Sequence, residues 1–179
     1  MWRSIPLVLL AAATTVAAAC ASPQPSGRPA GSDRGVVTHL VDGDTLDVRI
    51  DGRTERVRLI GVDTPESVAP DRPVQCYGAE ASTYLASLVP EGTEVRLERD
   101  RVARDQYGRL LAYVHRVEDD LLVNLAMVEQ GYADAVTYGD NEALYPRLVA
   151  AEAAASAAGR GLWGVCGGPD VDLTPDAAG

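Results

Sequence analysis

The sequence contains no lysine, so all 16 of its basic residues are arginines. Acidic residues number 26, and the formal net charge is −10. Proteins that bind nucleic acids usually carry a basic surface. The overall charge therefore disfavours polynucleotide binding, unless the arginines are concentrated at one site.

Histidine and cysteine are also scarce. The chain has two histidines, His39 and His115, and three cysteines, Cys20, Cys76 and Cys166. A structural zinc ion usually takes four cysteine or histidine ligands. This supply of ligands disfavours a zinc site.

The N-terminal stretch MWRSIPLVLLAAATTVAAAC has one positive residue, Arg3, followed by an apolar run and then small residues. This order is typical of a secretory signal, and the apolar run is too short to favour a transmembrane helix. Its end resembles a bacterial lipoprotein box, in which Cys20 receives lipid and becomes the mature N-terminus. Ala17 stands where such boxes usually have leucine, and ordinary secretion after a neighbouring Ala-x-Ala cut is the alternative. Loss of Arg3 would leave a net charge of −11.

Composition divides the rest of the chain into three parts. Residues 20–34 are rich in Pro, Ser and Gly and predict a disordered tether. Residues 167–179 predict a disordered tail, and residues 35–166 are enough for one domain with one core. In an exported protein, Cys76 and Cys166 are expected to form a disulfide. Two buried free thiols are the alternative.

Alternating and helical patterns predict an α+β domain. Strands are expected over 36–41, 45–50, 56–60, 93–97 and 109–115, with a tight turn at Asp51-Gly52 between the second and third. Three helices are expected: one through Ala81 to Leu88, one over 124–131 and one over 146–159. Short strands in this number favour a small closed β-barrel.

Carboxylates occur beside two of these strand ends. Asp42 and Asp44 flank a glycine after the first strand, and Asp63 and Glu66 follow the third. Neighbouring strands lie close together, so the two groups can converge. Converging carboxylates repel unless a cation lies between them, and hard oxygen ligands favour Ca²⁺ or Mg²⁺. A plain surface turn is the alternative for Asp42-Gly-Asp44.

Two arginines belong to the same pattern. Arg58 lies near the end of the third strand, and Arg109 opens the fifth after Asp-Gln-Tyr-Gly. A guanidinium can hold two phosphate oxygens in fixed geometry. Carboxylates, a metal and two arginines are what phosphodiester hydrolysis requires. Other strand arginines, such as Arg49, Arg53 and Arg56, have no such motif around them and are expected to face solvent.

Six motifs occur together in this chain: VDGDT, RLIGVDTPE, YGAEAS, DQYGRLLAY, VNLAMVEQGYA and GLW. In this order and spacing they resemble the staphylococcal nuclease (thermonuclease-like) family over about residues 36–165. The resemblance implies a five-stranded OB-fold barrel with three α-helices. It also implies Ca²⁺-dependent cleavage of DNA and RNA that leaves 3′-phosphates.

The resemblance also implies roles for single residues. Asp44, Asp63 and the main-chain carbonyl of Thr64 would bind Ca²⁺, with Asp42 in the outer shell. The catalytic residues would be Arg58 and Arg109, which contact phosphate, and Glu66, the general base. Substrate-lining positions would be taken by Tyr107, Tyr113 and Tyr138. The loops 67–75 and 137–141 lack the lysines with which well-known members bind polymer.

Together these features predict a monomeric, Ca²⁺-dependent endonuclease that is exported and tethered to the outer face of the cell membrane through Cys20. An OB-fold module that binds nucleic acid or protein without cleaving it is the alternative, favoured by the acidic net charge. A purely structural envelope lipoprotein is a third reading, but it would not need the set of carboxylates and arginines.

Overall fold

The computed structural model describes residues 32–67, 73–137 and 139–173. Five strands close into a barrel in the order β1-β2-β3-β6-β5. They are β1 (Ser32–Leu40), β2 (Thr45–Ile50), β3 (Arg53–Leu59), β5 (Glu94–Glu98) and β6 (Leu110–Arg116). Strands β3 and β6 pair in parallel, and the other pairs are antiparallel. The expected fold class, a five-stranded OB-type barrel with helices, is confirmed.

The first three strands form a meander. Apolar and polar residues alternate along β2, and the two-residue turn after it leads directly into β3. Leu46 and Val48 are fully buried inside the barrel. Between β2 and β3, Asp51 and Gly52 both adopt positive φ, 48° and 81°. A two-residue turn of this kind matches the twist of the strands that it joins. The turn therefore fixes the register that brings Thr45 opposite Arg58.

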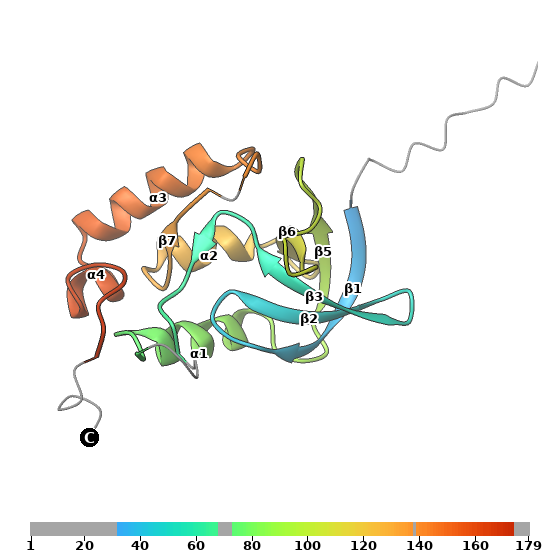
Figure 1. Ribbon diagram of the computed structural model, residues 1–179, viewed down its shortest axis with the longest axis horizontal. Coiled ribbons are helices and arrows are strands. Elements are labelled where there is room, and N and C mark those ends of the chain that lie inside the picture. The colour runs from blue at the N-terminus through green and yellow to red at the C-terminus, as the bar shows by residue number, and fades with distance from the viewer. Residues whose placement is uncertain (1–31, 68–72, 138, 174–179) are drawn as a thin grey trace, which may run out of the picture.

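The helices cover one side of the barrel (Figure 1). They are α1 (Gly78–Leu88), α2 (Val123–Glu129), α3 (Tyr145–Ala157) and the short α4 (Leu162–Val165). Helix α2 packs against both β6 and α3, and residues 123–128 are all buried for that reason. A small second sheet, β4 (Val62–Asp63) with β7 (Asp134–Ala135), and helix α4 were not expected, because elements so short show no periodicity.

Two predicted boundaries were wrong. Strand β1 begins at Ser32, so the last three residues of the expected tether belong to the barrel. Residues 171–173, expected in a disordered tail, pair with residues 74–76. The expected signal (residues 1–19) and Cys20 lie outside the described residues. No helix of the described part is both long and apolar enough to cross a membrane.

A disulfide joins Cys76 to Cys166, as the cysteine count predicted. The two Cα atoms are 6.0 Å apart, and the bond spans 90 residues of sequence. It connects the turn before α1 to the residue after α4. The start of the first helix is therefore tied to the C-terminal end of the domain.

Candidate active site

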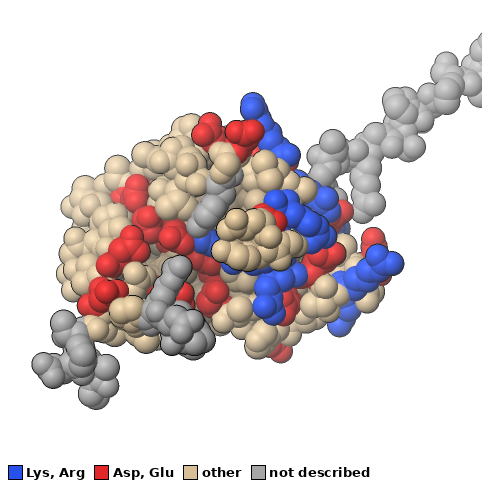
Figure 2. All heavy atoms as spheres, in the orientation of Figure 1, with Lys and Arg blue, Asp and Glu red and all other residues tan. Residues whose placement is uncertain are grey.

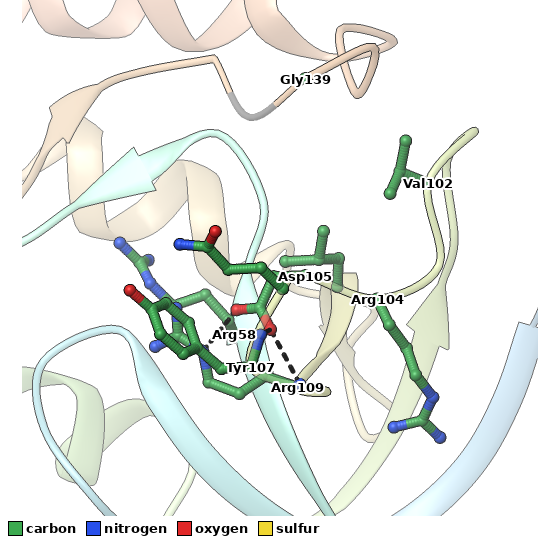
Figure 3. Close-up of a pocket in the computed structure, with 9 residues that line it drawn as sticks. Arg58, Val102, Arg104, Asp105, Tyr107, Arg109 and Gly139 are labelled. Atoms are coloured by element: carbon green, nitrogen blue, oxygen red, sulfur yellow. Dashed lines mark hydrogen bonds and ion pairs between the residues drawn. The ribbon is translucent and has the colours of Figure 1, made fainter.

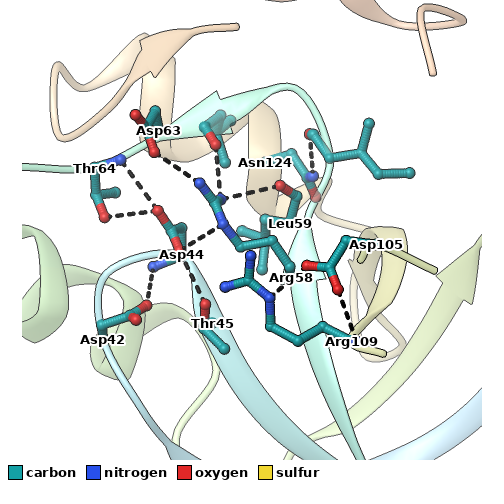
Figure 4. A network of polar contacts seen from close by, with 12 residues as sticks. Asp42, Asp44, Thr45, Arg58, Leu59, Asp63, Thr64, Asp105, Arg109 and Asn124 are labelled. Atoms are coloured by element: carbon teal, nitrogen blue, oxygen red, sulfur yellow. Dashed lines mark hydrogen bonds and ion pairs between the residues drawn. The ribbon is translucent and has the colours of Figure 1, made fainter. Parts of the chain in front are cut away.

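Asp44 lies at the centre of a network of polar contacts (Figure 4). One carboxylate oxygen accepts hydrogen bonds from the amide and the hydroxyl of Thr64, at 3.2 and 3.0 Å. The other accepts a bond from the hydroxyl of Thr45 and lies 3.0 Å from Nε of Arg58. The approach of the two turns requires Gly43, because a Cβ there would lie 2.6 Å from Oγ1 of Thr64.

The environment of Asp44 opposes its negative charge. Only 6% of the residue is exposed. Burial raises the pKa of Asp44 to about 7; the charge of Arg58 lowers it, and the charges of Asp42 and Asp63 raise it further. The amide of Asp44 also donates to the carboxylate of Asp42 at 3.0 Å. A bound cation would relieve the repulsion among these three carboxylates.

Arg58 connects the carboxylates to the end of its strand. Its side chain is almost fully buried. The guanidinium donates to the carbonyls of Leu59 and Val62, at 3.2 and 2.8 Å, and to Oδ1 of Asp63 at 2.7 Å. These contacts hold the guanidinium in one orientation between Asp44 and Asp63. Arg53 and Arg56, on the same strand, are exposed and are not buried between carboxylates in this way.

Arg109 is held by a carboxylate that sequence reasoning missed. Oδ1 of Asp105 accepts hydrogen bonds from the main-chain amides of Tyr107 and Arg109, both at 2.9 Å. Oδ2 accepts a hydrogen bond from Nε of Arg109 at 2.6 Å. Burial alone would raise the pKa of Asp105, but the hydrogen bonds and charge of Arg109 lower it. The signal in the sequence was an acidic residue four positions before Arg109.

Tyr107 stands at the edge of the same loop and is 76% exposed. Its ring centroid lies 5.5 Å from Cζ of Arg109, within the range of a cation–π contact. The loop turns at Gly108, whose φ of 82° suits glycine. Figure 3 shows the two side chains beside Arg58 at the mouth of a pocket.

Two cavities meet at the arginines. The larger, of about 380 Å³, is lined by Arg58, Arg104, Tyr107, Arg109 and Leu111, among others. The smaller, of about 170 Å³, is lined by polar residues: Asp42, Asp44, Arg58, Asp63, Thr64, Glu66, Ser67 and Arg109, together with Pro65. Arg58 and Arg109 line both. A phosphate at the arginines could thus have carboxylates on one side and a tyrosine-lined pocket on the other.

The polar cavity brings together the predicted metal, base and arginine positions. Several carboxylates line it, and carboxylate oxygens are hard ligands suited to Ca²⁺. No three Asp, Glu, His or Cys side chains in the described ranges are arranged as ligands of one ion.

Tyr107 lines the larger cavity, as predicted for a substrate-lining residue, but Tyr113 does not. Tyr113 is 1% exposed, and its hydroxyl donates to Asp100 at 3.1 Å and accepts from the amide of Leu144 at 3.2 Å. Burial raises its pKa to about 12. The prediction that Tyr113 lines the substrate pocket was wrong, because the side chain belongs to the core. Tyr138 lies outside the described residues.

Asn141 is a second residue that sequence reasoning missed. It is fully buried, and its side-chain amide exchanges hydrogen bonds with the main chain of Val102, at 2.7 and 3.0 Å. Val102 lines the larger cavity. Asn141 therefore fixes one wall of that cavity. A buried asparagine has no signal in the sequence that separates it from a turn residue.

The arginines are unevenly distributed over the surface. Figure 2 shows the basic side chains gathered over the barrel side of this face, while acidic side chains also extend over the helical side. Several of these arginines are paired with acidic residues, among them Arg56 with Asp47 and Arg104 with Glu55, so the gathering of arginines is not the same as a net positive surface.

Several known proteins are similar to this chain in sequence. Residues 56–165 match the family described as staphylococcal nuclease homologues. A thermonuclease of Staphylococcus intermedius is 46% identical over 107 residues, which cover 60% of this chain and 62% of that protein. A thermonuclease of Staphylococcus hyicus is 39% identical over 127 residues, covering 71% of this chain and 73% of that one.

A longer relative also matches. Endonuclease YhcR of Bacillus subtilis is 34% identical over 142 residues, which cover 74% of this chain but 12% of that protein. The match thus extends over less than two thirds of the S. intermedius protein and a small part of the B. subtilis one.

Proposed function

Because the chain belongs to the staphylococcal nuclease family, we propose that it is an endonuclease that hydrolyses phosphodiester bonds of DNA and RNA with Ca²⁺, leaving 3′-phosphates. One observation carries this proposal. Asp44, Asp63, Glu66, Arg58 and Arg109 line a single polar cavity of about 170 Å³. That combination fits hydrolysis of a phosphodiester better than it fits binding alone.

Residues of the chain would divide the work as follows. Asp44, Asp63 and the carbonyl of Thr64 would hold Ca²⁺, which when bound supplies positive charge against the phosphate. Arg109 is fixed through its Nε to Asp105, and among the described residues no contact engages its terminal nitrogens with an acidic group. These nitrogens would donate to phosphate oxygens as negative charge develops on them.

Glu66 would act on the attacking water. Glu66 is among the residues that line the polar cavity, and its carboxylate would take the proton of water as the oxygen attacks phosphorus. Arg58, fixed between Asp44 and Asp63, would keep its positive charge next to the reacting phosphate without needing to reorganise. The bond between phosphorus and the 5′ oxygen then breaks, that oxygen takes up a proton from solvent and leaves as a 5′-hydroxyl, and the phosphate stays on the 3′ side. Tyr107 would contact the sugar or base next to that phosphate.

The assay that tests this proposal uses single-stranded DNA, double-stranded DNA and RNA as substrates, with Ca²⁺ and with excess chelator. We expect cleavage with Ca²⁺, products that end in a 3′-phosphate, and no cleavage in chelator. Full activity in chelator would refute the metal assignment. Absence of cleavage on all three substrates would refute the enzyme assignment.

An OB-fold module that binds but does not cleave remains the second candidate function, because the net charge of the chain is −10. Equilibrium binding measured beside cleavage separates the two. Binding without cleavage in Ca²⁺, unaffected by Arg109→Lys, would favour the module. Binding should weaken as salt rises in either case.

We propose further that the protein is exported and held at the outer face of the cell membrane through lipid on Cys20, and that it acts as a monomer. The disulfide between Cys76 and Cys166 supports export, since disulfides persist outside the cytosol. Mass spectrometry of the mature N-terminus tests the anchor. A lipid-modified Cys20 that is lost in Cys20→Ala is expected, and an unmodified N-terminus elsewhere would make the protein an ordinary secreted one.

A further inference from the structure

Gln75 contacts both main-chain polar groups of Glu66. The amide of Gln75 donates to the carbonyl of Glu66 at 2.8 Å. The amide of Glu66 donates to the side-chain oxygen of Gln75, also at 2.8 Å. We call this pair of hydrogen bonds the Gln75 clasp. It fixes the main chain of Glu66 at both of its hydrogen-bonding groups, and therefore the point from which the carboxylate extends.

The side chain of Gln75 has a second partner, on the C-terminal segment. Its Nε2 donates to a carboxylate oxygen of Asp170 at 3.3 Å. An amide has one acceptor end and one donor end. Only one orientation lets Gln75 accept from Glu66 and donate to Asp170 together. The contact with Asp170 therefore favours the orientation that the clasp requires.

The main chain around Gln75 is held by the same segment. The amide of Cys76 donates to the carbonyl of Val171 at 2.7 Å, and the amide of Leu173 donates to the carbonyl of Val74 at 2.9 Å. The disulfide from Cys76 to Cys166 ties the two chain sections together. Residues 74–76 thus lie between Glu66 on one side and the C-terminal segment on the other.

Helix α1 packs against Glu66 from a further direction. At Gly78, a Cβ would lie 2.7 Å from the carbonyl oxygen of Glu66. This close approach leaves the main chain of Glu66 no room to move toward the helix. The amide of Gly78 also donates to the carbonyl of Gln75 at 3.3 Å.

From these contacts we propose that Gln75 is a positioning residue for Glu66, and that the disulfide-linked C-terminal segment holds Gln75 in place. The inference rests on the proposed nuclease function, in which Glu66 takes a proton from water. Its consequence is specific: loss of the side-chain half of the clasp should lower kcat and leave KM unchanged, because Gln75 lines neither the polar cavity nor the tyrosine pocket. Reduction of the disulfide should act in the same direction.

The first test compares Gln75→Ala with Thr83→Ala. Thr83 is an exposed residue of α1, and its hydroxyl donates to the carbonyl of Ala79 in the same helix. For Gln75→Ala we expect kcat to fall about 10- to 100-fold, the usual loss when a supporting hydrogen bond around a reacting group is removed, with KM unchanged. Thr83→Ala should keep the wild-type kcat. An unchanged kcat in Gln75→Ala, or a rise in KM alone, would refute the inference.

The second test separates positioning from stability. The variant Cys76→Ser/Cys166→Ser is compared with Val95→Ala, which removes buried methyl groups on β5, at the end of the barrel remote from Arg109. Both variants should melt at lower temperature than wild type. Assayed well below both melting temperatures, only the cysteine variant should lose kcat. Equal losses would show that the disulfide acts through stability alone.

Hydrogen exchange at the amide of Glu66 provides a readout that does not depend on activity. The rate should rise in Gln75→Ala and in the cysteine variant, and stay unchanged in Thr83→Ala. An unchanged rate in Gln75→Ala would refute the clasp. If the wild-type protein had no nuclease activity, the proposed function would fail, and this exchange measurement would still decide whether Gln75 holds Glu66.

Discussion

Replacement of Asp44 by asparagine should stabilise the metal-free protein at pH 8. The residue is 6% exposed, and burial raises its pKa from 3.8 to about 7. In the unfolded chain the group titrates near its ordinary value. Between about pH 4 and pH 7 the folded protein therefore binds more protons than the unfolded chain, and wild-type stability falls as pH rises through this range.

The size of this effect follows from the pKa of Asp44. Each tenfold change in proton affinity corresponds to about 1.4 kcal/mol. A pKa near 7 instead of 3.8 makes ionisation of Asp44 cost the folded state about 4 kcal/mol at pH 8. Asparagine removes that cost, but it has only one acceptor oxygen for the donors from Thr64, Thr45 and Arg58. A buried donor left without a partner costs about 1–3 kcal/mol, so the expected net gain at pH 8 is about 1–3 kcal/mol.

Urea unfolding of wild type and Asp44→Asn, from pH 4 to pH 8 in chelator, measures this difference. Asp51→Asn is the control, because Asp51 is exposed at the β2–β3 turn and its φ of 48° is one that asparagine tolerates. The gain should be absent at pH 4 and largest at pH 8 for Asp44→Asn only. A difference that does not grow with pH, or a less stable variant at pH 8, would refute the reasoning. The stabilised variant should also have lost its nuclease activity.

Three further outcomes are expected. Asn124→Ala should lower the free energy of unfolding by about 3 kcal/mol in urea melts, because its fully buried side-chain amide forms hydrogen bonds with the main chain at positions 114, 60 and 112. A loss below about 1 kcal/mol, the size of one ordinary hydrogen bond, would contradict this. Arg109→Lys should cut single-turnover cleavage about 10²–10³-fold, because an ammonium lacks the two-pronged contact with phosphate; near-normal rates would remove Arg109 from the site. Reduction of the Cys76–Cys166 disulfide, which spans 90 residues, should lower the melting temperature and cost up to about 4–5 kcal/mol; equal melting curves with and without reductant would show that the bond contributes nothing.

Sequence patterns predicted the barrel well because each strand of the meander has one buried face. Leu46 and Val48 alternate with polar residues, and the Asp51-Gly52 turn is a strong local signal. Strand β6 is different, since residues 110–114 are buried without alternation between the barrel interior and α2. Position within that strand could not distinguish a core tyrosine from a pocket tyrosine, which is why Tyr113 was misplaced.

The predicted site residues lie together, but the contacts that orient them could not be read from the sequence. Motif order placed Arg58 near the carboxylates, whereas its burial and its bonds to Val62 and Asp63 required the fold. The C-terminal segment was expected to be disordered because of its Gly, Pro and Asp content. Its order comes from long-range contacts with residues 74–76 and from the disulfide, which composition does not report.

A single comparison decides whether this cavity cleaves phosphodiester bonds with Glu66 as base. Single-turnover cleavage of DNA in Ca²⁺ is measured beside equilibrium binding for wild type, Glu66→Gln and Glu80→Gln, where Glu80 is an exposed acid in the first turn of α1. We expect a strong loss of cleavage with intact binding in Glu66→Gln, and wild-type values for both quantities in Glu80→Gln. Cleavage that survives in Glu66→Gln would remove Glu66 as the base, and wild-type protein that binds DNA and never cleaves it would show that the domain is not a nuclease.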